Sequence, residues 1–218
     1  PDLRVAIAKN VKETRAIEID PGRVLVTPGG KPIIFFTALA LVQPGDEIMY
    51  PDPGFPIYES MIRFLGARPV SIRLSKEEGC HLDLEDLESK ISRRTKMIII
   101  NSPHNPTGSI MSRQEVTNLA GIIKTREDIY VLSDEIYKDI LYGGKHFSIA
   151  AIPGMEQRTI ILDGFSKSYA MTGWRLGYGI FPDEVFPHVD KLAANSVSCA
   201  ASFTQKAAIA ALEGPQTM

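Results

Sequence analysis

Residues 96–137 read KMIIINSPHNPTGSIMSRQEVTNLAGIIKTREDIYVLSDEIY, and this stretch contains the unit on which the fold is built. The apolar runs at 96–101 and 129–133 predict two strands that are buried on both faces. The segment 113–125 between them has a helical pattern, and Ser112 and Glu115 have the spacing of a capping box at its start. Strands that alternate with helices are typical of an α/β sheet whose strands are mostly parallel.

The same alternation continues on both sides of this stretch. Further strands are predicted at 24–26, 47–50, 69–74, 159–162 and 176–181, and further helices at 31–42, 56–65, 84–91, 183–196 and 203–212. No repeat, low-complexity tract or linker marks a domain boundary. In such a sheet, the ligand crevice is expected at the carboxyl ends of the strands.

Composition excludes several classes of protein. The chain has 218 residues, 24 Lys plus Arg against 26 Asp plus Glu, and a net charge of −2, so we expect neither a nucleic-acid partner nor a membrane partner. Cys80 and Cys199 belong to no paired motif, which favours two free thiols and a cytoplasmic location. The four histidines (His81, His104, His146, His188) lack metal-ligand spacing, so we expect them at the surface or in loops and predict no metal site.

Two polar segments follow predicted strands and could bind a ligand. In the segment 27–31 (Thr-Pro-Gly-Gly-Lys), glycines and the free N–H groups of a helix start suit a phosphate, although an ordinary turn fits equally well. In 101–108 (Asn-Ser-Pro-His-Asn-Pro-Thr-Gly), two prolines stiffen the loop and could hold Asn105 in place. The alternative for this loop is a turn whose asparagines satisfy local backbone groups.

Two further segments carry groups suited to a heterocyclic cofactor. Asp134 ends an apolar strand and Tyr137 follows it, so a carboxylate could protonate a pyridine nitrogen while a phenol donates to a ring oxygen. An exposed helix-capping Asp134 is the competing interpretation. In 163–178, Lys167 follows an apolar strand, where desolvation would free its amine as a nucleophile, and Arg175 offers a planar fork for phosphate.

These four segments, in this order, resemble the class I/II aminotransferases of fold type I, which use pyridoxal 5′-phosphate (PLP) and are related to aspartate aminotransferase. Residues 44–47 (Pro-Gly-Asp-Glu), 51–58 (Pro-Asp-Pro-Gly-Phe-Pro-Ile-Tyr) and 105–108 (Asn-Pro-Thr-Gly) reinforce the resemblance, which extends over essentially the whole chain. The most specific match is Ser166-Lys167 followed by Gly-Trp-Arg-Leu-Gly-Tyr at 173–178. The resemblance implies a three-layer α/β/α fold with a mostly parallel mixed sheet of about seven strands.

The resemblance also implies roles for individual residues. Lys167 matches the lysine that forms the internal aldimine, and Asp134 matches the acid that keeps the pyridine nitrogen protonated. Tyr137 and Asn105 match the pair that hydrogen-bonds the phenolic oxygen of the ring. The phosphate partners and the ring-stacking aromatic are matched by Gly30, Lys31, Ser166, Arg175 and Phe55. Gly164 departs from members that carry a phosphate-binding hydroxyl there, which puts one phosphate contact in doubt.

The implied activity is PLP-dependent transfer of an amino group between an amino acid and a 2-oxo acid, in amino-acid metabolism. The matched motifs do not separate this outcome from that of a β-lyase, a decarboxylase or a cyclopropane-forming synthase, and they leave the substrates open. A non-catalytic regulatory module with an aminotransferase-like domain is a further alternative, against which stands the lack of a basic stripe.

The resemblance finally implies that residues 1–218 are the PLP-binding large domain of a longer protein, which in the family is a homodimer. We expect the N-terminal arm and the C-terminal small domain to lie largely outside this sequence, together with the arginine that binds the substrate carboxylate. The proline at position 1 and the lack of a tyrosine before Tyr50 fit that expectation. The fragment alone would then turn over weakly or not at all.

Overall fold

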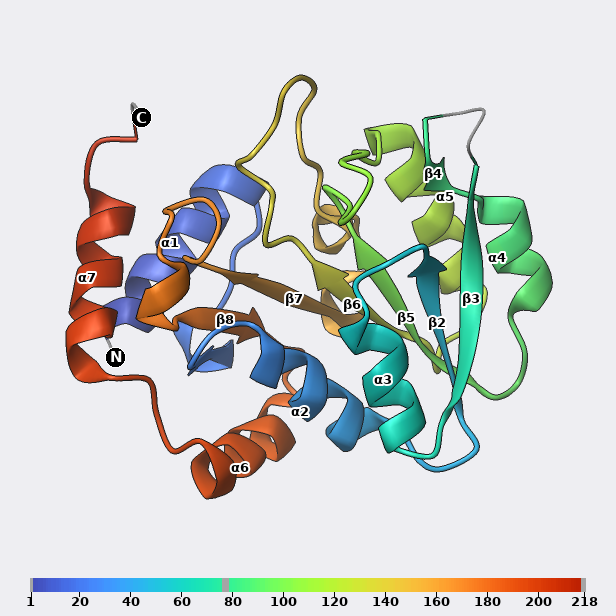
Figure 1. Cartoon of the computed structure of the whole chain (residues 1–218), viewed down its shortest axis with the longest axis horizontal. Helices are drawn as coiled ribbons and strands as arrows, with labels where there is room; N and C mark the ends of the chain where they lie inside the picture. Colours follow the sequence, from blue (N-terminus) through green and yellow to red (C-terminus); the bar gives the residue numbers. More distant parts are fainter. Residues whose placement is uncertain (1, 76–78, 217–218) are drawn as a thin grey trace.

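The computed structural model describes residues 2–75 and 79–216, which form an α/β fold around one sheet of eight strands (Figure 1). The order of the strands across the sheet is β1-β8-β7-β6-β5-β2-β3-β4. Their bounds are β1 (Val24–Thr27), β2 (Glu47–Asp52), β3 (Arg68–Ser75), β4 (His81–Leu82), β5 (Thr95–Asn101), β6 (Tyr130–Asp134), β7 (Thr159–Gly164) and β8 (Gly177–Ile180).

The directions of the strands bring the carboxyl ends of several strands to the same edge of the sheet. The neighbouring strands β7, β6, β5, β2 and β3 are parallel, while β8 is antiparallel to both β7 and β1, and β4 is antiparallel to β3. Because β1 therefore runs in the same direction as β7, the ends of β1, β2, β5, β6 and β7 share an edge with the beginning of β8. A ligand crevice was predicted at this edge.

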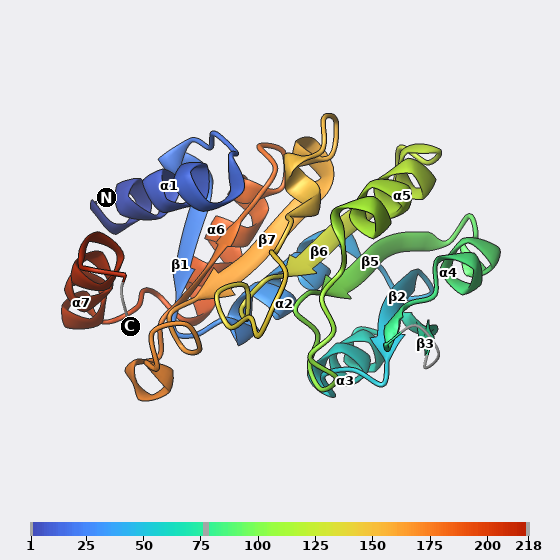
Figure 2. The ribbon, with the colours of Figure 1, turned by 90° about the horizontal axis from the view of Figure 1, so that it is seen from above.

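Helices cover both faces of the sheet. Their bounds are α1 (Asp2–Arg15), α2 (Lys31–Leu41), α3 (Ile57–Phe64), α4 (Leu84–Lys90), α5 (Arg113–Lys124), α6 (Phe186–Ser196) and α7 (Ser202–Glu213). Helices α2, α3 and α6 pack on one face, and α1, α4 and α5 pack on the other, with α7 against α1. Figure 2 shows α1 and α5 along the same side of the sheet. Three layers of α, β and α were predicted and are confirmed.

Strand β5 shows why the sheet lies between two helical layers. Met97 and Ile99 are buried in the core beneath α2 and α3, whereas Ile98 and Ile100 are buried in the core beneath α4 and α5. Side chains alternate between the two faces of a strand, so a strand covered on both faces must be apolar throughout. Such continuous apolar runs made the strands recognisable in the sequence.

Several details differ from the predictions. Helix α1 and the short strand β4 were not predicted, so the sheet has eight strands instead of about seven. Helix α6 begins at Phe186 and not at 183, with Pro187 in its first turn, where no intrahelical N–H is needed. His104 and the ring of His146 lie in loops as predicted, but both are largely buried. No helix within 2–75 or 79–216 is long and apolar enough to cross a membrane.

Candidate active site

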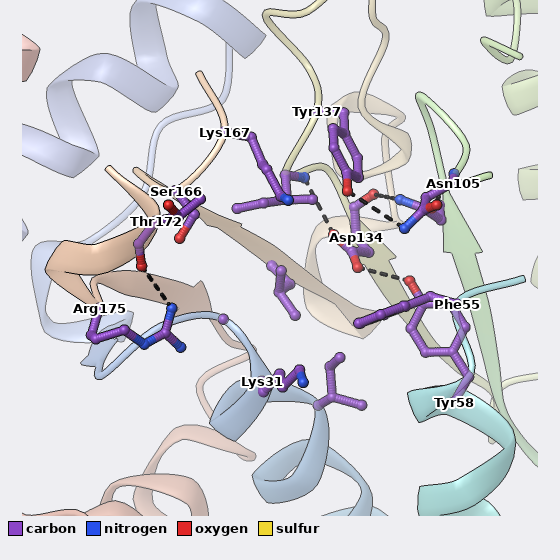
Figure 3. A pocket seen from close by; sticks show the side chains of 15 residues that line it. Lys31, Phe55, Tyr58, Asn105, Asp134, Tyr137, Ser166, Lys167, Thr172 and Arg175 are labelled. Atoms are coloured by element: carbon purple, nitrogen blue, oxygen red, sulfur yellow. Dashed lines mark hydrogen bonds between the residues drawn. The ribbon is translucent and has the colours of Figure 1, made fainter. Parts of the chain in front are cut away.

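A cavity of about 260 Å³ opens at the predicted edge of the sheet (Figure 3). Its lining includes all nine residues that the sequence suggested for cofactor binding: Gly30, Lys31, Phe55, Asn105, Asp134, Tyr137, Ser166, Lys167 and Arg175. Asp134 is the last residue of β6, and the other residues come from the segments that follow β1, β2, β5 and β6 and from the segment between β7 and β8. Six other residues complete the lining: Ile34, Tyr58, Asn101, Ile136, Leu162 and Thr172.

The turn between β1 and α2 forms one end of the cavity. Gly30 is the N-cap residue of α2, and no side chain caps the first N–H groups of this helix. Those N–H groups and the positive end of the helix dipole favour an anion. Gly29, with φ of +86°, provides a left-handed turn that brings the backbone to this position.

Arg175 lies directly on this turn. A Cβ atom at Gly29 would be 2.3 Å from Arg175 Nη2, so the guanidinium fills the space that any other residue at position 29 would need. Gly177, the first residue of β8, approaches as closely, since its Cβ would lie 2.6 Å from the backbone of Gly29 and Gly30. Arg175 Nη1 donates to the carbonyl of Thr172 at 3.0 Å, and this bond orients the fork toward the cavity. The guanidinium and the uncapped N–H groups of α2 together form a cradle that suits an anion.

Asp134 supplies a buried carboxylate deeper in the cavity. It ends β6 with an exposed fraction of 5%, so the alternative of an exposed helix cap is wrong. Tyr58 Oη donates to Asp134 Oδ2 at 2.7 Å, and the backbone N–H of Ile136 donates to Oδ1 at 3.3 Å. Burial raises the pKa of Asp134 to about 6, these two bonds oppose the rise, and the nearby charges of Asp163 and Glu135 add to it.

Asn105 and Tyr137 form a pair of donors beside Asp134. Asn105 Nδ2 lies 3.4 Å from Tyr137 Oη, and the Asn105 backbone N–H donates to Asn101 Oδ1 at 2.8 Å. The bond between Asn105 and Pro106 is cis, as is the one between Ser102 and Pro103. The two hydrogen bonds of Asn105 hold its amide beside the Tyr137 phenol.

Phe55 offers an aromatic face to the cavity. Its ring packs edge-on against Tyr58, with centroids 5.9 Å apart, and Lys31 Nζ lies 5.8 Å from the centre of the Phe55 ring. Figure 3 shows Phe55 and Tyr58 on the side of the cavity nearest α3. A flat ligand could stack on this ring.

Lys167 lies in the segment that follows β7. Its Nζ is 5.4 Å from the centre of the Tyr137 ring. Among the described residues, no carboxylate forms an ion pair with Lys31, Lys167 or Arg175. The cavity thus combines three cationic side chains with a single carboxylate, and it suits an anionic ligand. Over the same residues, no group of three His, Cys, Asp or Glu side chains could hold a metal ion.

Comparison with known proteins agrees with this arrangement. The profile of the family "Aminotransferase class I and II" matches residues 1–218. The chain belongs to the class I and II aminotransferase family. Aspartate aminotransferase of Sulfolobus acidocaldarius is 39% identical over 214 residues, which are 97% of this chain and 53% of that protein. The probable aspartate/prephenate aminotransferase of Aquifex aeolicus is 38% identical over 219 residues, which are 100% of this chain and 55% of that protein.

Solved structures of aminotransferases share the fold. The aromatic aminotransferase of Pyrococcus horikoshii superposes with a TM-score of 0.95 at 34% identity, over 99% of this chain and 58% of its own. The aspartate aminotransferase of Rhizobium meliloti superposes with a TM-score of 0.96 at 32% identity, over 100% and 55%. The aminotransferase chain described here therefore spans about half the length of the relatives it matches.

The sequence predictions did not include three lining residues of this cavity, Tyr58, Asn101 and Thr172. Tyr58 lies three residues after Phe55, and its backbone N–H donates to the Phe55 carbonyl in the turn that leads into α3. The bond from Tyr58 to Asp134 joins residues 76 positions apart. Asn101 Nδ2 donates to the Asp134 carbonyl at 2.9 Å. Thr172 accepts the bond from Arg175 through its backbone carbonyl. Because every residue has such a carbonyl, the residue type at position 172 could not indicate this contact.

Proposed function

We propose that this protein binds PLP and transfers an amino group between an amino acid and a 2-oxo acid. The observation that carries the proposal is the convergence of three groups in one cavity: the amine of Lys167, the buried carboxylate of Asp134 and the anion cradle at Gly29, Gly30 and Arg175. Membership of the aminotransferase family supports it, as do the names of the relatives.

The cradle is the proposed place of the phosphate. The backbone N–H groups of Gly30 and Lys31 begin α2, and Arg175 lies against the same turn. Ser166 lines the cavity from the segment after β7 and is the proposed hydroxyl partner. A planar guanidinium and uncapped helix N–H groups are a strong donor set for a phosphate, so the residues present fit this group.

The proposed place of the pyridine ring lies between Phe55 and Asp134. Phe55 would stack on the ring face, and Asp134 would hold a proton on the ring nitrogen. A positively charged nitrogen beside Asp134 favours its ionised form, which the bond from Tyr58 also favours. Asn105 and Tyr137 are the proposed donors to the phenolic oxygen of the ring.

When bound, PLP supplies an electron-poor ring that accepts the electron pair left at a substrate α-carbon. Lys167 Nζ is the proposed group that would take the proton from this carbon and deliver it to the carbonyl-derived carbon of the cofactor, as transfer of the amino group requires. Among the described residues it has no ion-pair partner, so no fixed carboxylate ties the amine down. Its position over Tyr137 keeps Nζ next to the proposed ring site.

The remaining assignments are also proposals. Residues 1–218 would be the PLP-binding large domain, and the whole protein would be a homodimer, acting on small-molecule substrates without nucleic acid or membrane. The two free cysteines, Cys80 and Cys199, support a cytoplasmic location. Sedimentation of the full-length gene product would test the dimer, and cell fractionation would test the location.

The deciding experiment incubates the full-length gene product with PLP, single amino acids and single 2-oxo acids, and follows both products by mass spectrometry. Aspartate with 2-oxoglutarate is the first pair to test, because relatives carry the name aspartate aminotransferase. Appearance of the new amino acid together with the new 2-oxo acid, and its loss in Lys167→Ala, supports the proposal. Release of CO₂ or ammonia without a new amino acid would overturn it in favour of another PLP reaction.

A further inference from the structure

Arg15 is an arginine buried at the end of α1, on the far side of Asp134 from the cavity. Its side chain is only 1% exposed, and it bridges two carboxylates at the same distance: Nε to Glu135 Oε2 and Nη2 to Asp163 Oδ2, both at 2.6 Å. The proposed reaction gives this arginine no role. A buried charge is costly unless it is paired, so the bridge calls for an explanation.

The two carboxylates that Arg15 pairs with are the neighbours of Asp134. Glu135 follows Asp134 in the chain, and Asp163 lies on β7 next to Leu162, which is in register with Asp134 on β6. All three are at most 5% exposed. Three negative charges in one buried group repel one another, and the repulsion favours protonation of the least compensated member.

Of the three carboxylates, Asp134 has the fewest partners that offset its negative charge. Glu135 accepts from Ser133 and Ser148, and His146 Nε2 lies 3.1 Å from its Oε2. Asp163 accepts from Tyr178 Oη at 2.8 Å, and Lys138 Nζ, which also pairs with Asp139, is 3.7 Å away. Asp134 itself has Tyr58 and the N–H of Ile136; the charged or titratable groups that share its cavity are Lys31, Tyr137, Lys167 and Arg175.

We propose that Arg15 is a positioning residue: by offsetting the charges of Glu135 and Asp163, it keeps the neighbouring Asp134 carboxylate ionised at neutral pH. The consequence for catalysis rests on the proposed function, in which ionised Asp134 holds a proton on the pyridine nitrogen. The electrostatic statement itself concerns only residues of this chain.

The directions of the pKa shifts of Arg15, Glu135 and Asp134 agree with the geometry. Burial would lower the pKa of Arg15, but Glu135 and Asp163 outweigh it and raise that pKa above its ordinary value. Burial would raise the pKa of Glu135, but Arg15, His146 and Ser148 outweigh it and hold that pKa well below its usual range. For Asp134, where no cation plays this part, burial and the charges of Asp163 and Glu135 leave the pKa raised.

Two substitutions among these residues should shift the pKa of Asp134 in opposite directions. Arg15→Met leaves Glu135 and Asp163 uncompensated and should raise the pKa of Asp134 by about one unit or more. Glu135→Gln keeps the shape but removes a negative charge beside Asp134, while Arg15 stays paired with Asp163, and should lower that pKa by a similar amount. In the double variant, which loses one charge of each sign, the pKa should return toward that of the unsubstituted protein.

The test is an infrared titration of the cofactor-free full-length gene product, in which the protonated carboxyl band of Asp134 is identified by its loss in Asp134→Asn. Opposite shifts in Arg15→Met and Glu135→Gln, with recovery in the double variant, support the proposal. Shifts of the same sign, or none, in folded protein would overturn it and leave Arg15 as a structural tie. If Arg15→Met does not fold, Glu135→Gln and the double variant still decide. Only the electrostatic role predicts that Glu135→Gln lowers the pKa of Asp134 and that adding Arg15→Met cancels this decrease.

This readout separates the proposal from the proposed function. The titration is done without PLP, so it can succeed even if the protein transfers no amino group. Conversely, the protein could transfer an amino group while the pKa of Asp134 is the same with and without Glu135→Gln. That result would refute the role of Arg15 and leave the proposed function standing. Arg15→Lys, which keeps the charge, is the matched control and should leave the titration of Asp134 nearest to that of the unsubstituted protein.

Discussion

Tyr58 donates its phenolic proton to Asp134 across a 2.7 Å hydrogen bond, which ties the start of α3 to the end of β6. Tyr58 is fully buried, and burial together with the charge of Asp134 raises the pKa of its phenol well above the ordinary value. The phenol therefore stays protonated and remains a donor over the whole working range of pH. A constant donor to a carboxylate stabilises its ionised form.

Replacing Tyr58 with Phe removes this donor without emptying the space. We expect the pKa of Asp134 to rise, and kcat to fall about tenfold, the value of one hydrogen bond to a charged group. The pH profile of kcat/KM measures the shift in the pKa, and kcat at saturating substrate measures the loss of rate. Tyr142→Phe, at a fully exposed tyrosine, is the control; an acidic limb of the profile that coincides in the two variants would contradict the prediction.

Lys167→Ala should abolish the covalent attachment of PLP. In the unsubstituted protein, borohydride reduction followed by peptide mapping should locate the cofactor on Lys167, and the variant should lose the visible absorption band. The control is Lys145→Ala, at an exposed lysine in the β6–β7 connection. A band of undiminished intensity in Lys167→Ala with PLP bound would show that another amine holds the cofactor.

Gly29→Ala should weaken PLP binding through a steric effect on Arg175. Its Cβ would lie 2.3 Å from Arg175 Nη2, so we expect the Kd for PLP, measured by fluorescence titration, to rise at least about tenfold. Gly45→Ala is a matched control, because Gly45 has a similar φ of +91° and nothing within 4 Å of the added Cβ. Both variants should lose about 1 kcal/mol of stability to backbone strain. Equal affinities in the two variants would remove the steric explanation.

Asp134→Asn should make the cofactor-free protein more stable in alkaline solution. The folded-state pKa of about 6 lies above the ordinary value of 3.8 for an aspartate, so the unfolded chain releases this proton at lower pH. Ionised Asp134 then costs stability that is absent below about pH 4, grows as the pH rises and is complete above pH 6. The rise of about two units corresponds to about 3 kcal/mol.

Urea unfolding at pH 4 and pH 8 measures this effect. We expect the advantage of the Asn variant to be large at pH 8 and to vanish near pH 4, where both side chains are neutral. A difference in free energy of unfolding that does not change with pH would mean that the amide acts through packing instead of through charge.

The sheet and most of its helices could be predicted because each depends on a local pattern. Apolar runs such as 96–101 indicate strands covered on both faces, and the capping box at Ser112 and Glu115 marks the start of α5, where the structure has it. Helix α1 was missed although Leu3, Ile7 and Val11, each four residues apart, form its buried stripe. The two residues of β4 are too few to show any period.

The candidate site divides in the same way. Residues next to strand ends could be selected by chemistry, and the fold brings all nine of them to one cavity, while their roles toward PLP stay predictions. The partners of Asp134 and Glu135 could not be selected, since Tyr58 and Arg15 lie 76 and 120 positions away. Only the packing of α1 and α3 against opposite faces of the sheet brings them near β6.

The segment between β7 and β8 starts and finishes at a single point of the sheet. Gly164 and Gly177 are partners in register, and a Cβ on Gly164 would lie 2.8 Å from the Cα of Gly177. Residues 165–176, which carry Ser166, Lys167 and Arg175, therefore form a loop that leaves the sheet and returns to it at adjacent positions. This loop could be exchanged between relatives by joining the chains at Gly164 and Gly177. Such an exchange would alter the reactive groups while β7 and β8 keep their alignment.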